Sequence, residues 1–147
     1  MNERIVVGVD GSETARLATR WAAREARQRG ATLVLASAWH LPTGAYYGPA
    51  PVSEDLVKDL ITGAEDIVAL ALQDVRDEAG MIPVETIVEE GQPTEVLLRA
   101  AESADLLVVG SRGMGGFREL LLGSVSQQLV HHAACPVVIV RHVHAAP

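Results

Sequence analysis

The chain has 147 residues, 48% of them hydrophobic but only 3% aromatic, and its formal net charge is −7. Its length allows a full core without disulfides or metals, and its aliphatic composition is typical of a buried parallel sheet covered by helices. The acidic balance and the single lysine, Lys58, exclude the basic face that nucleic-acid binding requires, and no apolar stretch reaches the roughly 18 residues of a membrane span.

Strand-like and helix-like segments alternate through the first half of the chain. The first residues lead directly into a β-branched run at 4–10, without the layout of a signal peptide, so we expect a cytoplasmic protein. Apolar residues at helical spacing follow from Glu13, and Gly30 marks the end of that helix. A second strand is expected at 31–38.

A change in composition follows the second strand. The segment between His40 and Val52 is rich in proline and glycine and predicts a long loop. Ser53 is then placed to cap a helix with one apolar stripe, which closes at Gly80.

The alternation continues to the end of the chain. Strands are expected at 83–89, 105–110 and 136–141, with helices that begin near Pro93 and at Ser124. This pattern predicts one α/β domain over residues 1–147, an open parallel five-stranded sheet with right-handed crossovers and helices on both faces.

The stretch from Gly110 to Ser126 carries the chemical signal of the sequence. It begins where an apolar strand ends, and Gly110 and Gly113 remove side chains where the backbone must approach a ligand or adopt a positive φ. The other interpretation is structural, because the same glycines permit a flexible loop and a tight helix entry. The spacing matches neither a P-loop nor G-x-G-x-x-G at a helix start.

The end of this stretch is a predicted helix start. Ser124 with Gln127 fits the S-x-x-Q capping box. A helix start offers unpaired N–H groups and the positive end of a dipole to a phosphate. Ser124 and Ser126 would add hydroxyl donors.

Together, Gly110, Gly113, Gly123 and Ser124 form the pattern G-x2-G-x9-G-S, which resembles the ATP-binding signature of the universal stress protein family. Three further runs are similar to that family: V-G-V-D-G-S at 7–12, L-L-L-G-S-V at 120–125 and C-P-V-V-I-V at 135–140. The likeness covers nearly the whole chain and is weakest at 40–52.

The resemblance implies strand order 3-2-1-4-5, a Rossmann-like sheet also similar to adenine nucleotide α-hydrolases. Strands 1 and 4 are then neighbours at the topological switch point, where ligands of open α/β sheets bind beyond the carboxyl ends of the strands. The sequence agrees, because Asp10 ends the first predicted strand and Gly110 the fourth.

The resemblance also implies a site for ATP with Mg²⁺. Asp10 would lie near the ribose or a phosphate-bound metal, although Asp before Gly is also a common turn residue. Ala38 would present its backbone to the adenine edge, and Arg112 would follow the phosphates. The implied binding residues are Gly8, Val9, Asp10, Ala38, Val109, Gly110, Arg112, Gly113, Gly123, Ser124, Val125 and Ser126.

The last predicted strand suggests a partner. Residues 136–141, which begin with Pro136 and end with Arg141, are apolar on both faces, and an uncovered sheet edge of this kind invites pairing. Universal stress proteins resemble one another in dimerising through this strand, so a homodimer is implied. A further protein partner, of unknown identity, would read the nucleotide-bound state.

No set of residues forms a convincing catalytic centre or metal site. The predicted loops contain no lysine, although phosphoryl transfer needs positioned cations. His131 and His132 fall near a helix end, where dipole placement explains them, and Cys135 is interpreted as a buried structural thiol. We expect a nucleotide-dependent binding or signalling module of the stress response and no enzyme, with slow ATP hydrolysis, cyclic AMP binding and absence of nucleotide left open.

Two other protein classes fit less well. A phosphorelay receiver would need a phosphoacceptor Asp after the third strand and a Lys near the fifth, where this chain has Glu89-Glu90-Gly91 and no lysine. An adenylating enzyme of the α-hydrolase group would need Ser-Gly-Gly-x-Asp-Ser after the first strand, and Asp10-Gly11-Ser12 matches this poorly.

Overall fold

A computed structural model describes residues 2–42, 52–113 and 122–142. In chain order they form β1 (Arg4–Gly8), α1 (Glu13–Arg29), β2 (Thr32–Trp39), α2 (Glu54–Ala79), β3 (Val84–Glu90), α3 (Pro93–Ala101), β4 (Leu106–Gly110), α4 (Ser124–His132) and β5 (Val137–Val140). Most of the predicted loop at 40–52, and residues 114–121 of the glycine-rich stretch, lie outside the described residues.

These five strands form one parallel sheet in the order β3-β2-β1-β4-β5. The expected fold class and strand order are therefore confirmed. The ends of the strands differ slightly from the prediction, since β1 stops at Gly8 and β2 continues to Trp39.

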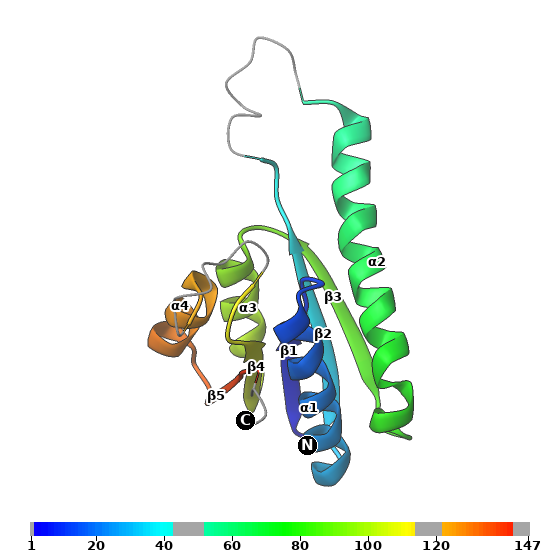
Figure 1. Ribbon diagram of the computed structural model, residues 1–147, viewed down its shortest axis with the longest axis vertical. Coiled ribbons are helices and arrows are strands. Elements are labelled where there is room, and N and C mark those ends of the chain that lie inside the picture. The colour runs from blue at the N-terminus through cyan, green and yellow to red at the C-terminus, as the bar shows by residue number, and fades with distance from the viewer. Residues whose placement is uncertain (1, 43–51, 114–121, 143–147) are drawn as a thin grey trace, which may run out of the picture.

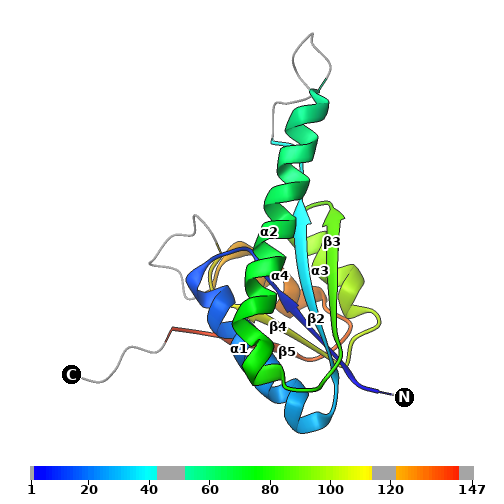
Figure 2. The same cartoon turned by 90° about the vertical axis from the view of Figure 1, so that its right-hand side faces the viewer.

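Helices cover both faces of the sheet (Figures 1 and 2). α1 and α2 pack on one face, over Ile5 and Val7, whereas α3 and α4 pack on the other, over Val6. All three side chains are almost completely buried. β1 is therefore buried on both faces, which explains why its sequence is a continuous apolar run without alternation.

Local signals fix the ends of the helices. Ser53 accepts a hydrogen bond from the Asp55 amide and caps α2, as predicted. Ser12 caps α1 in the same way by accepting from the Ala15 amide, 3.3 Å away. Gly30 ends α1 in the left-handed conformation at φ 65°, which glycine adopts without steric cost.

An exposed ion pair joins the first residue of β1 to β3. Arg4 Nη2 lies 2.9 Å from Glu85 Oε2. This hydrogen bond lowers the pKa of the Glu85 carboxyl and raises the pKa of the Arg4 guanidinium. The pair therefore links stability to pH through Glu85.

Replacing this glutamate, as Glu85→Gln, should remove a small stabilisation that depends on pH. Because the folded pKa of Glu85 is depressed, the wild type gains this stabilisation above the unfolded pKa, about 4.3, and loses it as the pH falls through the folded pKa. The pair is exposed, so the effect in urea unfolding at pH 7 should stay below about 1 kcal/mol. A difference between the two proteins that is as large at pH 3 as at pH 7 would contradict this assignment.

Candidate functional site

The carboxyl ends of β1 and β4 lie side by side, with Val7 opposite Val108 in register (Figure 1). Asp10 follows β1 by two residues, and Gly110 ends β4. The predicted site residues of these two segments are therefore brought together at the switch point of the sheet, where ligands of open α/β folds bind.

Close packing against α1 explains Gly110. A Cβ at this position would lie 2.5 Å from Thr14 Oγ1, 2.7 Å from the Thr14 carbonyl carbon and 2.8 Å from the Ala15 nitrogen. Its φ is not among the positive values found in the described residues. Gly110 thus makes room for the start of α1, which lies directly against it. The close approach to a ligand that was expected from the sequence stays a prediction.

Gly8 is packed in a similar way from the other face. A Cβ there would lie 2.9 Å from Leu97 Cδ1 of α3. The neighbouring site residues Val9 and Val109 are 6% and 4% exposed and belong to opposite core clusters. The side chains of Val9 and Val109 are therefore occupied by packing, which leaves only the backbone of these positions for the predicted contacts with a ligand.

Asp10 combines a turn contact with a position facing the glycine-rich stretch. Its Oδ1 accepts a hydrogen bond of 2.9 Å from the Ser12 amide, which is the turn arrangement considered from the sequence. A Cβ at Gly113 would lie 2.9 Å from Asp10 Oδ2. The carboxylate is thus fixed through one oxygen, and the absence of a side chain at Gly113 leaves space beside the other.

The start of α4 is held against the end of β4. The Gly123 amide donates to the Ser111 carbonyl at 2.6 Å, and the Ser111 amide donates to the Val140 carbonyl of β5 at 2.9 Å. A Cβ at Gly123 would lie 3.4 Å from Arg112 Cα and 3.7 Å from the Gly113 nitrogen. The helix start therefore lies against the backbone that follows β4, and its Gly123 amide is hydrogen-bonded within the protein.

The predicted capping box of α4 is wrong. Gly123 is the N-cap, with extended backbone at φ −72° and ψ 169°, and Ser124 is the first helical residue. Gln127 Nε2 donates instead to the Leu122 carbonyl at 3.2 Å. Within the described part of the chain no side chain caps this helix, so its positive end is not neutralised by a capping oxygen.

Ser126 of α4 is hydrogen-bonded to the end of β4. Its side chain is 3% exposed, and its hydroxyl donates to the Gly110 carbonyl at 2.7 Å. In this structure the hydroxyl proton is thus used by the protein backbone, and the expected contact between Ser126 and a phosphate stays a prediction.

The remaining predicted residues surround this core of the site. Ala38 is a half-buried residue of β2, opposite Glu89 of β3, and lies one strand away from the β1–β4 junction. Arg112 is half-buried, Ser124 is exposed and Val125 packs partly against the α3–α4 core. Contacts of these residues with a ligand stay predictions.

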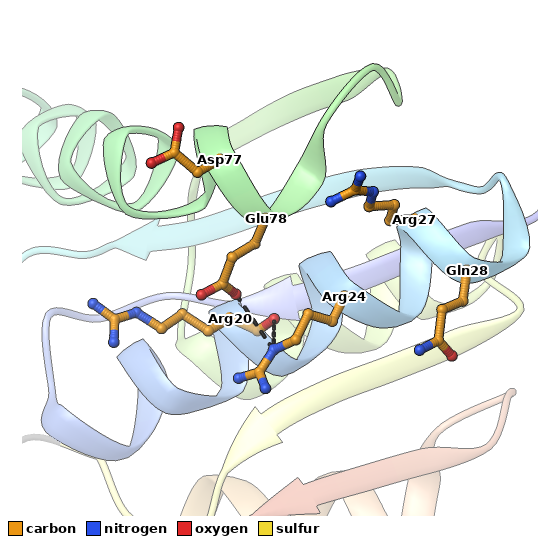
Figure 3. A pocket seen from close by; sticks show the side chains of 6 residues that line it. All are labelled: Arg20, Arg24, Arg27, Gln28, Asp77 and Glu78. Atoms are coloured by element: carbon orange, nitrogen blue, oxygen red, sulfur yellow. Dashed lines mark hydrogen bonds and ion pairs between the residues drawn. The ribbon is translucent and has the colours of Figure 1, made fainter.

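Two concavities among the described residues lie between α1 and α2. The larger is a polar groove along the second half of α1, away from the carboxyl ends of the strands (Figure 3). There Arg24 Nε lies 3.4 Å from Glu78 Oε2 without a hydrogen bond between them. The smaller cavity, about 230 Å³, adjoins Val9 and Gly11 and is below the roughly 300 Å³ at which ligand pockets begin.

Cys135 is less buried than expected, and its structural role stays a prediction. It is half-buried and packs against the α3–α4 core. Burial and the nearby Asp105 carboxylate raise the pKa of its thiol, so the reactive thiolate is disfavoured.

Sequence reasoning missed Thr14. Its hydroxyl donates to the Arg112 carbonyl across 98 positions of sequence, and no motif marks a contact of that range.

The described residues contain no group of three metal-ligating side chains placed to hold an ion. None of the described helices is long and apolar enough to cross a membrane.

Comparison with known proteins gives a consistent result. The model of the universal stress protein family matches residues 1–141. A universal stress protein of Thermus aquaticus is 38% identical over 143 residues, covering 96% of this chain and all of the relative. One from Mycolicibacterium smegmatis is 36% identical over 92% of this chain, which spans only 47% of that longer protein.

Solved structures agree with the sequence comparison. The universal stress protein UspA of Lactobacillus plantarum superposes with a TM-score of 0.82 at 27% identity, covering 95% of this chain and 97% of its own. A universal stress protein solved in complex with cAMP gives a TM-score of 0.68 at 28% identity, with 94% and 95% covered. With a family match over almost its whole length and the same fold, the chain belongs to the universal stress protein family.

Proposed function

We propose that this universal stress protein binds ATP at the carboxyl ends of β1 and β4 and acts as a nucleotide-dependent binding or signalling module of the stress response. The observation that carries the proposal is the meeting of Asp10, Gly113 and the start of α4. They lie so close that a Cβ added at Gly113 would be 2.9 Å from Asp10 Oδ2, and one added at Gly123 would be 3.7 Å from the Gly113 nitrogen. A helix N-terminus without a capping side chain attracts phosphate, and an adjacent carboxylate suits a phosphate-bound Mg²⁺.

The relative solved with cAMP supports an adenine nucleotide as the class of ligand. The preference for ATP rests on the G-x2-G-x9-G-S pattern from Gly110 to Ser124, which resembles the ATP-binding signature of the family and would offer main-chain amides to the phosphates. Cyclic AMP is the second candidate, because that relative holds it at a comparable fold.

Isothermal titration of the purified chain with ATP, ADP, AMP and cyclic AMP, with and without Mg²⁺, tests the proposal. We expect saturable binding of one nucleotide per chain, with ATP bound most tightly in the presence of Mg²⁺. Mass spectrometry of small molecules released by denaturing freshly purified protein gives an independent measurement. Absence of binding by all four nucleotides at millimolar concentration would overturn the proposal, and tighter binding of cyclic AMP would replace ATP as the ligand.

We further propose that the nucleotide is held and not turned over at an appreciable rate. Lys58 is the only lysine of the chain and lies on the exposed side of α2, so no lysine is placed to assist phosphoryl transfer at the proposed site.

A cytoplasmic location and a homodimer through β5 are also part of the proposal. β5 is a half-buried apolar strand at the edge of the sheet, which supports pairing with a second copy. Light scattering measures the molar mass in solution and tests whether the protein is a dimer.

A further inference from the structure

We infer that Thr14 is a positioning residue for the nucleotide site, because its hydroxyl ties the start of α1 to the loop backbone at Arg112. The inference rests on the proposed function, since it concerns the same site. It adds a residue of α1 that makes no part of the glycine-rich pattern.

The contact is specific and sheltered. Thr14 is the second residue of α1 and is 8% exposed. Its Oγ1 donates to the carbonyl of Arg112, the residue before Gly113. The same residue lies directly against Gly110, where no Cβ would fit. Thr14 thus meets the chain at the end of β4 and again two residues later.

The other ties to this backbone come from different elements. The Ser126 hydroxyl of α4 donates to the Gly110 carbonyl. The Ser111 amide donates to the Val140 carbonyl, and the Ser111 carbonyl accepts from the Gly123 amide. Those contacts hold the loop from the side of α4 and β5. The Thr14 hydroxyl comes from α1, so it holds the backbone at Arg112 from the opposite side.

Holding Arg112 in place sets the position of the next residue. Gly113 faces Asp10 Oδ2 across the gap in which a Cβ would be 2.9 Å from the carboxylate. Without the tie, the Arg112 carbonyl loses its hydrogen bond to α1, so the Arg112–Gly113 peptide is held less firmly and its amide must be ordered further when a nucleotide binds. The cost of that ordering appears as lost affinity.

The test compares Thr14→Val, which keeps shape but removes the hydroxyl, with Thr14→Ser, which keeps the hydroxyl. Thr19→Val is the matched control, because Thr19 is a buried threonine of the same helix whose hydroxyl donates to the Ala15 carbonyl inside α1. We expect Thr14→Val to weaken ATP binding about 3- to 10-fold, as one net hydrogen bond predicts. Thr14→Ser and Thr19→Val should stay within about twofold of the wild type.

A second measurement separates this inference from the proposed function. Hydrogen exchange of the Gly123 amide, without nucleotide, reports the tie between α4 and Ser111. It should accelerate in Thr14→Val relative to Thr19→Val, with the Val9 amide, bonded to Ala36 at 2.8 Å, as the internal reference. Faster exchange in a protein that binds no nucleotide would support the tie and reject the nucleotide proposal.

The inference is overturned if Thr14→Val matches the wild type in both affinity and exchange. It is also overturned if Thr19→Val loses as much ATP affinity as Thr14→Val, or if Thr14→Ser does not keep the wild-type affinity. Either result would indicate that the loss of affinity does not come from the Thr14 hydroxyl. Should Thr14→Val not fold, Thr14→Ala takes its place, since it adds no atom to the contact with Gly110.

Discussion

Substitution of Gly110 by alanine should strongly destabilise the folded protein. The added Cβ would be placed within 2.5–2.8 Å of three atoms of Thr14 and Ala15. Two of these are backbone atoms of α1, which cannot move without shifting the helix from the sheet. Overpacking of this kind costs about 1–3 kcal/mol or more, and we expect about 3 kcal/mol in urea unfolding, or failure to fold.

Gly63→Ala is the matched control for this substitution. Gly63 lies inside α2 and is exposed, and apart from the local backbone of its own helix no atom lies within 4 Å of an added Cβ. Alanine there should stabilise the helix by about 0.5–1 kcal/mol. The packing assignment at Gly110 would be wrong if Gly110→Ala unfolded at the same urea concentration as the wild type.

The second large effect concerns binding. Gly113→Ala should raise the dissociation constant for ATP at least tenfold, or about 1.4 kcal/mol, while the protein stays folded. The Cβ would lie 2.9 Å from Asp10 Oδ2, and Asp10 cannot turn away freely because its Oδ1 is bonded to the Ser12 amide. The substitution thus fills the gap and displaces the carboxylate.

Titration calorimetry and thermal unfolding on the same preparation separate binding from stability. No left-handed φ is found at Gly113, so alanine meets no backbone strain there and the melting temperature should change little. Gly63→Ala should bind as the wild type does. Unchanged ATP affinity in Gly113→Ala would show that the gap beside Asp10 is not used by the nucleotide.

Local features of the fold could be predicted from the sequence because they depend on neighbours in the chain. Ser53 caps α2 and Gly30 ends α1 as expected. α4 begins at Ser124 as expected, but its cap was harder to predict, because Gly123 and Ser124 are both able to cap. The Gly123 amide donates to the carbonyl of Ser111, twelve residues earlier, and this contact has no local signature in the sequence.

The candidate site shows the same limit. The glycines of the pattern could be found by spacing, and the resemblance supplied the strand order that brings Asp10 to Gly113. The packing against Gly110 could not be predicted, since the atoms that crowd it belong to α1, which is distant in the sequence. Thr14 could not be predicted, because its partner is distant in sequence and a threonine at a helix start is usually explained by the helix itself.

The bond from Ser111 to Val140 has a consequence for assembly. Pairing between β4 and β5 does not stop where the strands end, because its last rung is made by the first residue of the glycine-rich loop. A strand added along the free side of β5 would extend a ladder that already includes this rung. The edge strand β5 and the first residue after β4 therefore belong to one hydrogen-bonded ladder. Pairing that restrains β5 should also restrain the backbone at Ser111, where the predicted nucleotide site begins.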